Sequence, residues 1–175
     1  MVEKSTWYDI VDTSECLLQG DFINACPVII PPKEVSESET VSAEVIQYDV
    51  VVMSQSCDLM QKKLDLVLVC PVWPMSQMES QSAFFAGSDG KERLRQGNVP
   101  GYHLLNECLL ERFESEYQVV DFRAVYSVPF EFITGFAESS GPRKRLLSPY
   151  REHLSQAFAR FFMRVGLPTD IPPFK

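Results

Sequence analysis

The sequence predicts a mainly β (α+β) domain with one long helix at its C-terminal end. Short apolar runs rich in β-branched residues are separated by turn-forming residues, as in antiparallel sheets. Only residues 149–165 combine the start signal, the periodicity and the stop signal of a long helix. With 175 residues, 45% of them hydrophobic and 23% charged, we expect a single folded domain over residues 1–175.

The strands of this domain are expected to form a sheet with strongly apolar inner strands. They cover residues 22–30, 48–53, 66–72, 102–105 and 118–126. Gly20-Asp21 provides the turn that leads into the first of them. The second and third strands are so uniformly apolar that both of their faces should be covered by other elements.

Two polar segments separate these strands. Residues 31–44 begin with Pro31-Pro32 and continue with four glutamates, which predicts an acidic loop. Residues 76–97 are rich in Ser, Gln and Gly, so we expect a short helix at their start and irregular structure after it. Neither segment contains a repeat or a low-complexity tract.

The C-terminal helix is the clearest single element. Ser148 is expected to cap it, Pro149 to occupy its first position, and Gly166 and Pro168 to end it. Its apolar face consists of Tyr150, Leu154, Ala157, Phe158, Phe161, Phe162 and Val165. Its polar face consists of His153, Gln156, Arg160 and Arg164. We expect both Phe158 and Phe162 to be buried against the sheet.

Charge is unevenly distributed along the chain. The net charge of −8 argues against a general nucleic-acid binder, which needs a concentrated positive surface. Residues 1–90 carry 14 acids and 4 bases, whereas residues 143–175 carry 7 bases and 2 acids, beginning with Arg143-Lys144-Arg145. These basic residues either neutralise the acidic half of the same molecule or dock an acidic partner. The first interpretation is slightly favoured.

The cysteines and the N-terminal end bear on location and cofactors. Five cysteines at irregular spacing indicate neither a disulfide framework nor a metal site, and we expect no metal and no cofactor. No apolar run is long enough to span a membrane, and the first residues do not resemble a secretion signal. We therefore expect a cytoplasmic protein without membrane association.

The loop after the second strand begins with Ser54-Gln55-Ser56-Cys57-Asp58 and raises three interpretations. In the first, Cys57 is a nucleophile with His103 as its base, although the adjacent Asp58 disfavours the reactive thiolate. In the second, Ser54, Ser56 and Asp58 bind the loop backbone and Cys57 points inward. In the third, the loop contacts a partner. The second is favoured over the first.

In the order of its motifs the sequence resembles the MazF/PemK family, over roughly residues 15–167. The matching motifs are Gly20-Asp21, Val50-Val51-Val52-Met53-Ser54, Val67-Leu68-Val69-Cys70-Pro71-Val72, Asp121-Phe122-Arg123-Ala124-Val125 and the C-terminal helix. The family consists of SH3-like small β-barrels that act as sequence-specific endoribonucleases in toxin–antitoxin systems. The resemblance therefore implies an SH3-like barrel with a C-terminal helix.

The departures from this family concern the catalytic positions. The ribonucleases carry Arg-Pro before the apolar strand, where the guanidinium stabilises the transition state, and this chain has Tyr48-Asp49 there. They carry Thr or Ser two residues after the strand proline, and this chain has Trp73. Neither replacement supplies the missing charge or aliphatic hydroxyl. The resemblance therefore implies that the ribonuclease chemistry is lost.

Two hypotheses about function follow. The first is a catalytically silent MazF-like protein-interaction module, an accessory part of a bacterial defence system of the toxin–antitoxin or CRISPR-associated kind. It has no catalytic residues, and its expected partner-binding residues are Gln55, Cys57, Asp58, Tyr102, His103, Arg123, Arg160 and Arg164. The alternative is an active endoribonuclease that uses Arg123, Tyr102 and His103 instead. The partner is expected to be a protein, and the net charge disfavours RNA.

Overall fold

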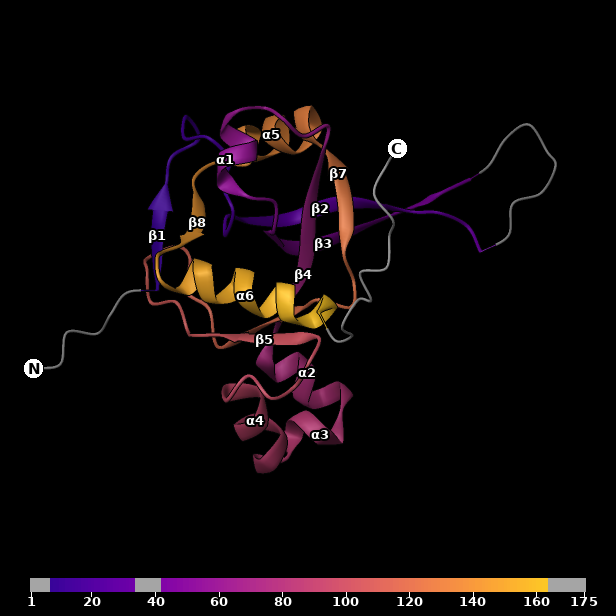
Figure 1. Cartoon of the computed structure of the whole chain (residues 1–175), viewed down its shortest axis with the longest axis vertical. Helices are drawn as coiled ribbons and strands as arrows, with labels where there is room; N and C mark the ends of the chain where they lie inside the picture. The colour runs from indigo at the N-terminus through magenta and orange to yellow at the C-terminus, as the bar shows by residue number, and fades with distance from the viewer. Residues whose placement is uncertain (1–6, 34–41, 164–175) are drawn as a thin grey trace, which may run out of the picture.

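The computed structural model of the protein describes residues 7–33 and 42–163 of the 175. In this part, the chain forms an α+β fold with eight strands and six helices, and the sheets are antiparallel (Figure 1). The α+β class predicted from the sequence is therefore confirmed. Among the described residues, no helix has the length and apolar character that crossing a membrane requires.

The main sheet is built around one central strand. Its strands are β2 (Phe22–Ile30), β3 (Glu44–Val52), β4 (Leu66–Pro74), β5 (Tyr102–Leu105), β6 (Gln118–Asp121) and β7 (Tyr126–Pro129). Their order is β2-β3-β4-β6-β5, and β7 also pairs with β4. The single strand expected over residues 118–126 is thus two strands, which pair with the two ends of β4. β2 and β5, the two ends of this order, do not pair with each other. The sheet is therefore open, and the expected barrel is not confirmed.

A second, two-stranded sheet was not expected from the sequence. β1 (Tyr8–Val11) pairs with β8 (Arg143–Leu146). The Leu146 N–H donates to the Gly20 carbonyl oxygen at 2.9 Å, which ties this sheet to the start of β2. β8 consists of the run Arg-Lys-Arg-Leu, whose charges indicate a solvated segment rather than a strand. Only its neighbours in the fold make it one.

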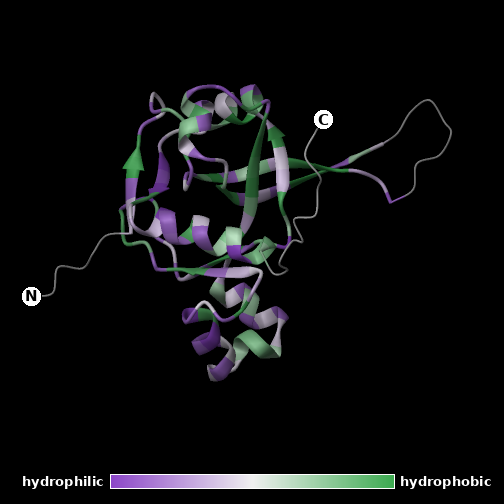
Figure 2. Cartoon of the chain, viewed as in Figure 1, coloured by the Kyte–Doolittle hydropathy of each residue, from purple (hydrophilic) through white to green (hydrophobic). Residues whose placement is uncertain are grey.

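The central strands are covered on both faces, as the sequence predicts. Val50, Val51 and Val52 are all at most 1% exposed although they alternate between the faces. On one face, α6 (Tyr150–Phe162) packs through Leu154, which belongs to the same apolar cluster as Val51. On the other face, α1 (Ser56–Met60) and α5 (Phe130–Ser139) pack in the cluster of Val50 and Val52. Figure 2 colours the central strand β4 as mostly hydrophobic.

Three short helices form a separate unit at one end of the molecule (Figure 1). They are α2 (Met75–Gln81), α3 (Ala83–Ala86) and α4 (Ser88–Arg95), where the sequence predicted only one short helix. Their buried residues pack against Val119 of β6. Gly90 of α4 has no room for a side chain, because a Cβ there would lie 1.9 Å from the Phe84 carbonyl oxygen. The absence of a side chain at Gly90 therefore allows α3 and α4 to pack in close contact.

The C-terminal helix is confirmed in part. α6 begins at Tyr150 rather than Pro149, and no side chain caps its first turn. Phe158 is half-buried and contacts the ring of Phe122, with the centroids 5.3 Å apart. Phe162 is 62% exposed, so the prediction that it is buried was wrong. The first turns of α6 pack on the sheet, whereas its last turn extends beyond the apolar surface beneath it. Val165, Gly166, Pro168 and most of the loop at 31–44 lie outside the described residues.

Candidate functional site

The structure separates the predicted partner-binding residues into two groups. Gln55, Cys57 and Asp58 lie at and in α1, beside α5, whereas β5 and α6 lie towards the other end of the molecule (Figure 1). Arg164 lies outside the described residues. The predicted residues therefore do not form one site.

The loop at α1 is mainly a structural connection. The Ser54 hydroxyl oxygen accepts a hydrogen bond from the Leu68 N–H at 2.9 Å, and the Ser56 hydroxyl oxygen accepts one from the Gln19 N–H at 3.2 Å. The two serines therefore have a structural role, but they accept from β4 and from the segment before β2 and not from the loop backbone, as the favoured interpretation expected. Asp58 lies in the first turn of the helix, where a carboxylate interacts favourably with the helix dipole. Cys57 is exposed, however, so the expectation that it points inward was wrong.

The second group lies on what we call the β5–α6 surface. Its residues are Tyr102, Arg123, Arg160, Phe161, Phe162 and Met163. The Arg123 guanidinium lies 4.4 Å from the Tyr102 ring centroid. Gly101, just before β5, lies close to both Arg123 and α6. A Cβ at this position would lie 3.1 Å from the Arg123 side chain and 3.3 Å from the Phe161 ring. Tyr102, Arg123 and Phe161, which are far apart in the sequence, therefore lie close together.

Arg123 is held in place but remains accessible. Its guanidinium donates two hydrogen bonds to the Asp121 carboxylate, at 2.9 and 2.7 Å. The hydrogen bonds to Asp121 raise the pKa of Arg123. Its side chain is 58% exposed, whereas that of Asp121 is 11% exposed. A planar cation fixed in this way is pre-organised to bind a further carboxylate or an aromatic ring.

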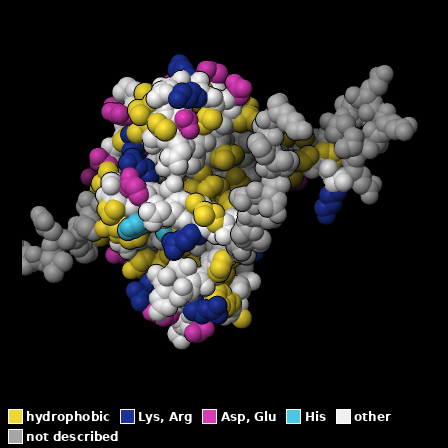
Figure 3. Space-filling model, in the orientation of Figure 1, with side chains coloured by type: hydrophobic (Ala, Val, Ile, Leu, Met, Phe, Trp, Pro, Cys, Tyr) yellow, Lys and Arg dark blue, Asp and Glu magenta, His cyan; other side chains and the backbone are white. Residues whose placement is uncertain are grey.

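Arg160 and the end of α6 complete the patch. Met163 is 77% exposed and follows the exposed Phe162. Within the described parts of the chain, no carboxylate lies within salt-bridge distance of Arg160. Figure 3 shows hydrophobic side chains beside basic and histidine side chains on this face of the molecule. Exposed aromatic and arginine side chains together are typical of protein interfaces.

His103 lies half-buried beside α6. Burial lowers the pKa of His103 to about 4, and the nearby charges of His153 and Arg160 add to this effect. Its ring stacks on Phe122, with the centroids 6.3 Å apart, and its Nε2 has no hydrogen-bond partner in the described structure. Because neighbouring residues of a strand point to opposite faces, His103 faces away from Tyr102. Tyr102 instead packs on Phe85 of the α2–α4 unit.

The two positions at which the chain departs from the resembled ribonucleases lie side by side. The rings of Tyr48 and Trp73 meet edge to face with centroids 5.8 Å apart, and Tyr126 stacks on Tyr48 at 5.5 Å. Burial and a hydrogen bond with Tyr48 raise the pKa of Tyr126. A phenol with a raised pKa keeps its proton at neutral pH. The cluster therefore offers ring faces and hydroxyls, and no cation.

The basic run at residues 143–145 is not a surface feature, so the docking alternative does not apply to it. Its two arginines pair with an acid of the same chain, as the slightly favoured interpretation expects, although they do so in the core and not on the surface. Arg143 and Arg145 are buried and share the fully buried Asp21, with Arg143 Nε 2.7 Å and Arg145 Nη2 2.9 Å from its Oδ2. Their guanidinium groups also donate to the backbone oxygen of Cys16. The run contributes to the core. The one hint in the sequence is Asp21, a single acid at the entry of an apolar strand.

The described residues contain no group of three or more His, Cys, Asp or Glu side chains that could hold a metal ion. Cys26, Cys70 and Cys108 are buried free thiols, whereas Cys16 and Cys57 are exposed. Burial raises the pKa of Cys26 to about 11 and that of Cys70 to about 12, which makes both thiols unreactive at neutral pH. No model of a known protein family matches this chain, and no curated protein matches its sequence.

Proposed function

We propose that this protein is a catalytically silent interaction module that docks an acidic protein through the β5–α6 surface. The observation that carries the proposal is the exposed end of α6, where Phe162 and Met163 are largely exposed and which follows the exposed Arg160 in the same helix. Apolar side chains this exposed cost free energy unless a partner covers them. The adjacent arginines favour a partner with carboxylates, since the guanidinium pairs with them bidentately.

Catalytic silence is supported by the aromatic cluster of Tyr48, Trp73 and Tyr126. In the resembled MazF-like proteins these strand positions supply a cation and a hydroxyl, which stabilise charge in the transition state. Here the same positions pack against each other as aromatic rings. The proposal includes the MazF-like, SH3-like barrel ancestry. It also includes a role as an accessory component of a bacterial toxin–antitoxin or CRISPR-associated defence system, which rests on that resemblance alone.

The alternative endoribonuclease has less support. Its three residues do not converge, because Tyr102 and His103 point to opposite faces of β5. A histidine with a pKa of about 4 is also a weak base at neutral pH. No observation therefore favours this activity over docking.

Docking can be tested by co-expressing the protein with the products of its neighbouring genes. A complex should form with the unmodified protein and be lost in the double variant Arg160→Glu/Phe162→Ser. The matched control is Lys62→Glu/Leu66→Ser, which changes an exposed cation and an exposed apolar side chain near α1. If the complex survives the first double variant and is lost in the second, the partner binds at α1 and the proposal is wrong.

Silence can be tested separately by incubating the protein with a mixed RNA pool. No cleavage is expected from the unmodified chain or from Tyr48→Arg, because catalytic groups act as a unit and one restored cation is insufficient. Cleavage that disappears in Arg123→Ala would instead establish the alternative endoribonuclease.

A further inference from the structure

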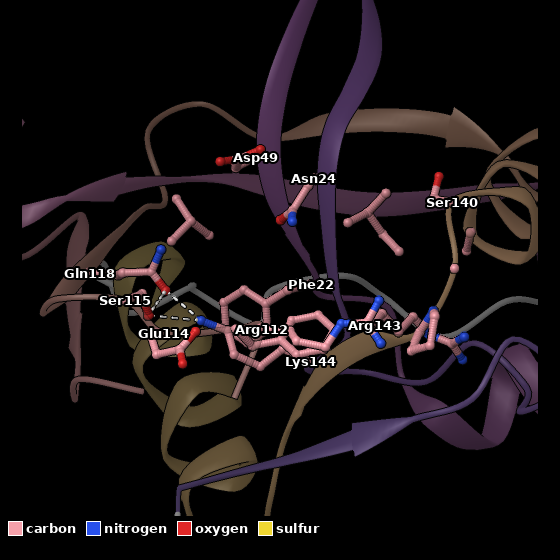
Figure 4. Close-up of a pocket in the computed structure, with 16 residues that line it drawn as sticks. Phe22, Asn24, Asp49, Arg112, Glu114, Ser115, Gln118, Ser140, Arg143 and Lys144 are labelled. Atoms are coloured by element: carbon pink, nitrogen blue, oxygen red, sulfur yellow. Dashed lines mark hydrogen bonds between the residues drawn. The ribbon is translucent and has the colours of Figure 1, made fainter. Parts of the chain in front are cut away.

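A polar cavity of about 290 Å³ lies away from the β5–α6 surface. It is bounded by the starts of β2 and β8, by Asp49 of β3 and by the segment that contains Arg112 and Ser115. Figure 4 shows the Lys144 amine at one side of this cavity, where it meets Ser115 and Gln118. The volume is that of a small metabolite, since a water molecule occupies about 30 Å³ in the liquid.

Lys144 is a buried cation without a carboxylate partner. It is 6% exposed, and its Nζ donates to the Gln118 Oε1 at 2.7 Å and to the Ser115 Oγ at 3.2 Å. No ion pair to Lys144 occurs among the described residues, in contrast to its neighbours in β8, which share Asp21. Two of the three N–H groups of the ammonium thus have neutral acceptors, which leaves one for another acceptor.

The remaining surroundings of Lys144 favour a bound anion. The ring centroids of Tyr8 and Phe22 lie 4.6 and 4.4 Å from its Nζ. These rings attract the cation but do not neutralise it. Burial lowers the pKa of Lys144 to about 8, although Cys108 and Asp49 oppose this. The charged amine is therefore only partly compensated, and an anion in the cavity would complete its environment.

Unusual backbone conformations occur on two sides of the same cavity. Arg112 lines the cavity and has a φ of 72°, a left-handed backbone conformation that is unfavourable for residues other than glycine. Ala25, with a φ of 48°, follows the lining residue Asn24 in a bulge of β2. The Asp49 carboxylate accepts a hydrogen bond from the Ala25 N–H at 2.8 Å and so holds this bulge. Such conformations cluster at ligand sites, where the surroundings enforce them.

We propose that this cavity binds a small polar molecule through one carboxylate or phosphate group, held by Lys144 and Arg112. Asn24 and Gln118 provide amide groups for the rest of the ligand. Asp49 and Glu114 also line the cavity, and they disfavour a ligand with several negative charges. The site is independent of the proposed docking surface, so either proposal can fail without the other.

The first experiment is a titration of the isotope-labelled protein with sodium acetate and, separately, with inorganic phosphate, followed by NMR at constant ionic strength. The amide signals of Ser115, Gln118 and Lys144 should shift and saturate with at least one of the two anions. The anion that saturates at the lower concentration identifies the preferred group. Shifts that grow linearly and spread over the whole protein would show only general screening and would overturn the proposal.

Two variants test the residues. Lys144→Met should weaken binding at least tenfold, whereas Lys91→Met, which changes a lysine of α4 paired with Glu79, should leave it unchanged. Arg112→Gly should also weaken binding but raise the unfolding temperature, because glycine accepts a φ of 72° without strain. Unchanged binding in Arg112→Gly would overturn the proposal even if Lys144→Met failed to fold.

Discussion

Two neighbouring parts of the C-terminal region reverse the usual relation between residue type and depth. In β8, the cations Arg143, Lys144 and Arg145 are at most 9% exposed. At the end of α6, the apolar Phe162 and Met163 are 62% and 77% exposed. The charged segment is core and the aromatic segment is surface. Both assignments are the opposite of what the composition of each segment indicates.

The difference teaches that the neighbours of a segment decide its depth. β8 lies between β1 and the start of β2, and there Asp21 and backbone oxygens meet the two guanidinium groups. α6 has a fully buried residue only at Leu154, and its later turns extend beyond the apolar surface beneath them. Residue type sets what burial costs, and the fold determines where burial occurs.

The largest expected effect is at the anion that makes β8 a core strand. Asp21→Asn leaves two buried guanidinium groups without a full counter-charge, which should lower the free energy of unfolding by about 3–5 kcal/mol. Urea denaturation measures this. Glu92→Gln, which removes the exposed partner of Arg95, is the control and should barely move the midpoint. A loss below about 1 kcal/mol in Asp21→Asn would mean that the arginines of β8 reach water.

The next effect separates the buried and exposed turns of α6. Phe158→Ala should cost about 2 kcal/mol, less than a fully buried phenylalanine, because the ring is half-buried against Phe122. Phe162→Ala should change the free energy of unfolding by less than about 0.5 kcal/mol. Chemical denaturation of both variants compares them. Equal and large losses would place the end of the helix in the core after all.

A third effect concerns the histidine beneath α6 and depends on pH. The pKa of His103 is about 4 in the folded protein and about 6.5 in the unfolded chain, so only the unfolded chain takes up a proton between these values. The contribution to stability is complete above pH 6.5 and is lost as the pH falls towards 4, by an amount on the order of 2 kcal/mol. Denaturation of His103→Gln over this range should show a flatter profile. A profile that His103→Gln leaves unchanged would mean that this histidine does not cause the pH dependence.

The smallest effects contrast two residues of the loop at α1. Ser54→Ala removes the buried acceptor of the Leu68 N–H and should cost about 1–2 kcal/mol. Cys57→Ala, at an exposed position, should stay within about 0.5 kcal/mol. Thermal unfolding of the two variants tests the contrast. A larger loss at Cys57 would give the thiol a role that its exposure does not indicate.

The sequence predicted the elements whose residues agree with their surroundings. β5 has the predicted bounds, the apolar β3 and β4 are covered on both faces, and α6 packs through its expected stripe at Leu154. It missed β1, β8 and α5, the short helix α1 in the expected loop, and the helices α3 and α4 in the expected irregular segment. β8 carries three charges in four residues, so no local pattern distinguishes it from a solvated segment.

The sequence predicted several residues of the candidate site, but not which of them the fold brings together. Tyr102, Arg123 and Arg160 were expected to contact a partner, and the fold brings Tyr102 and Arg123 together beside Phe161 of the helix that carries Arg160. His103 was expected there as well, but strand alternation turns it beneath α6. The cavity at Lys144 had no signal in the sequence. It depends on contacts between residues more than 25 positions apart, such as Lys144 with Gln118.

The sequence by itself determined the α+β class, the apolar strands and the position of the last helix, because these depend on local periodicity and on turn and stop residues. The tertiary structure alone decided that Arg143, Lys144 and Arg145 are buried and that Phe162 is exposed. Compensation of a buried charge depends on partners brought from distant parts of the chain, here Asp21 and Gln118. The exposure of an aromatic ring depends on where the surface beneath the helix ends. Neither the compensation of a buried charge nor the exposure of a ring can be read from the residue or from its neighbours in the sequence.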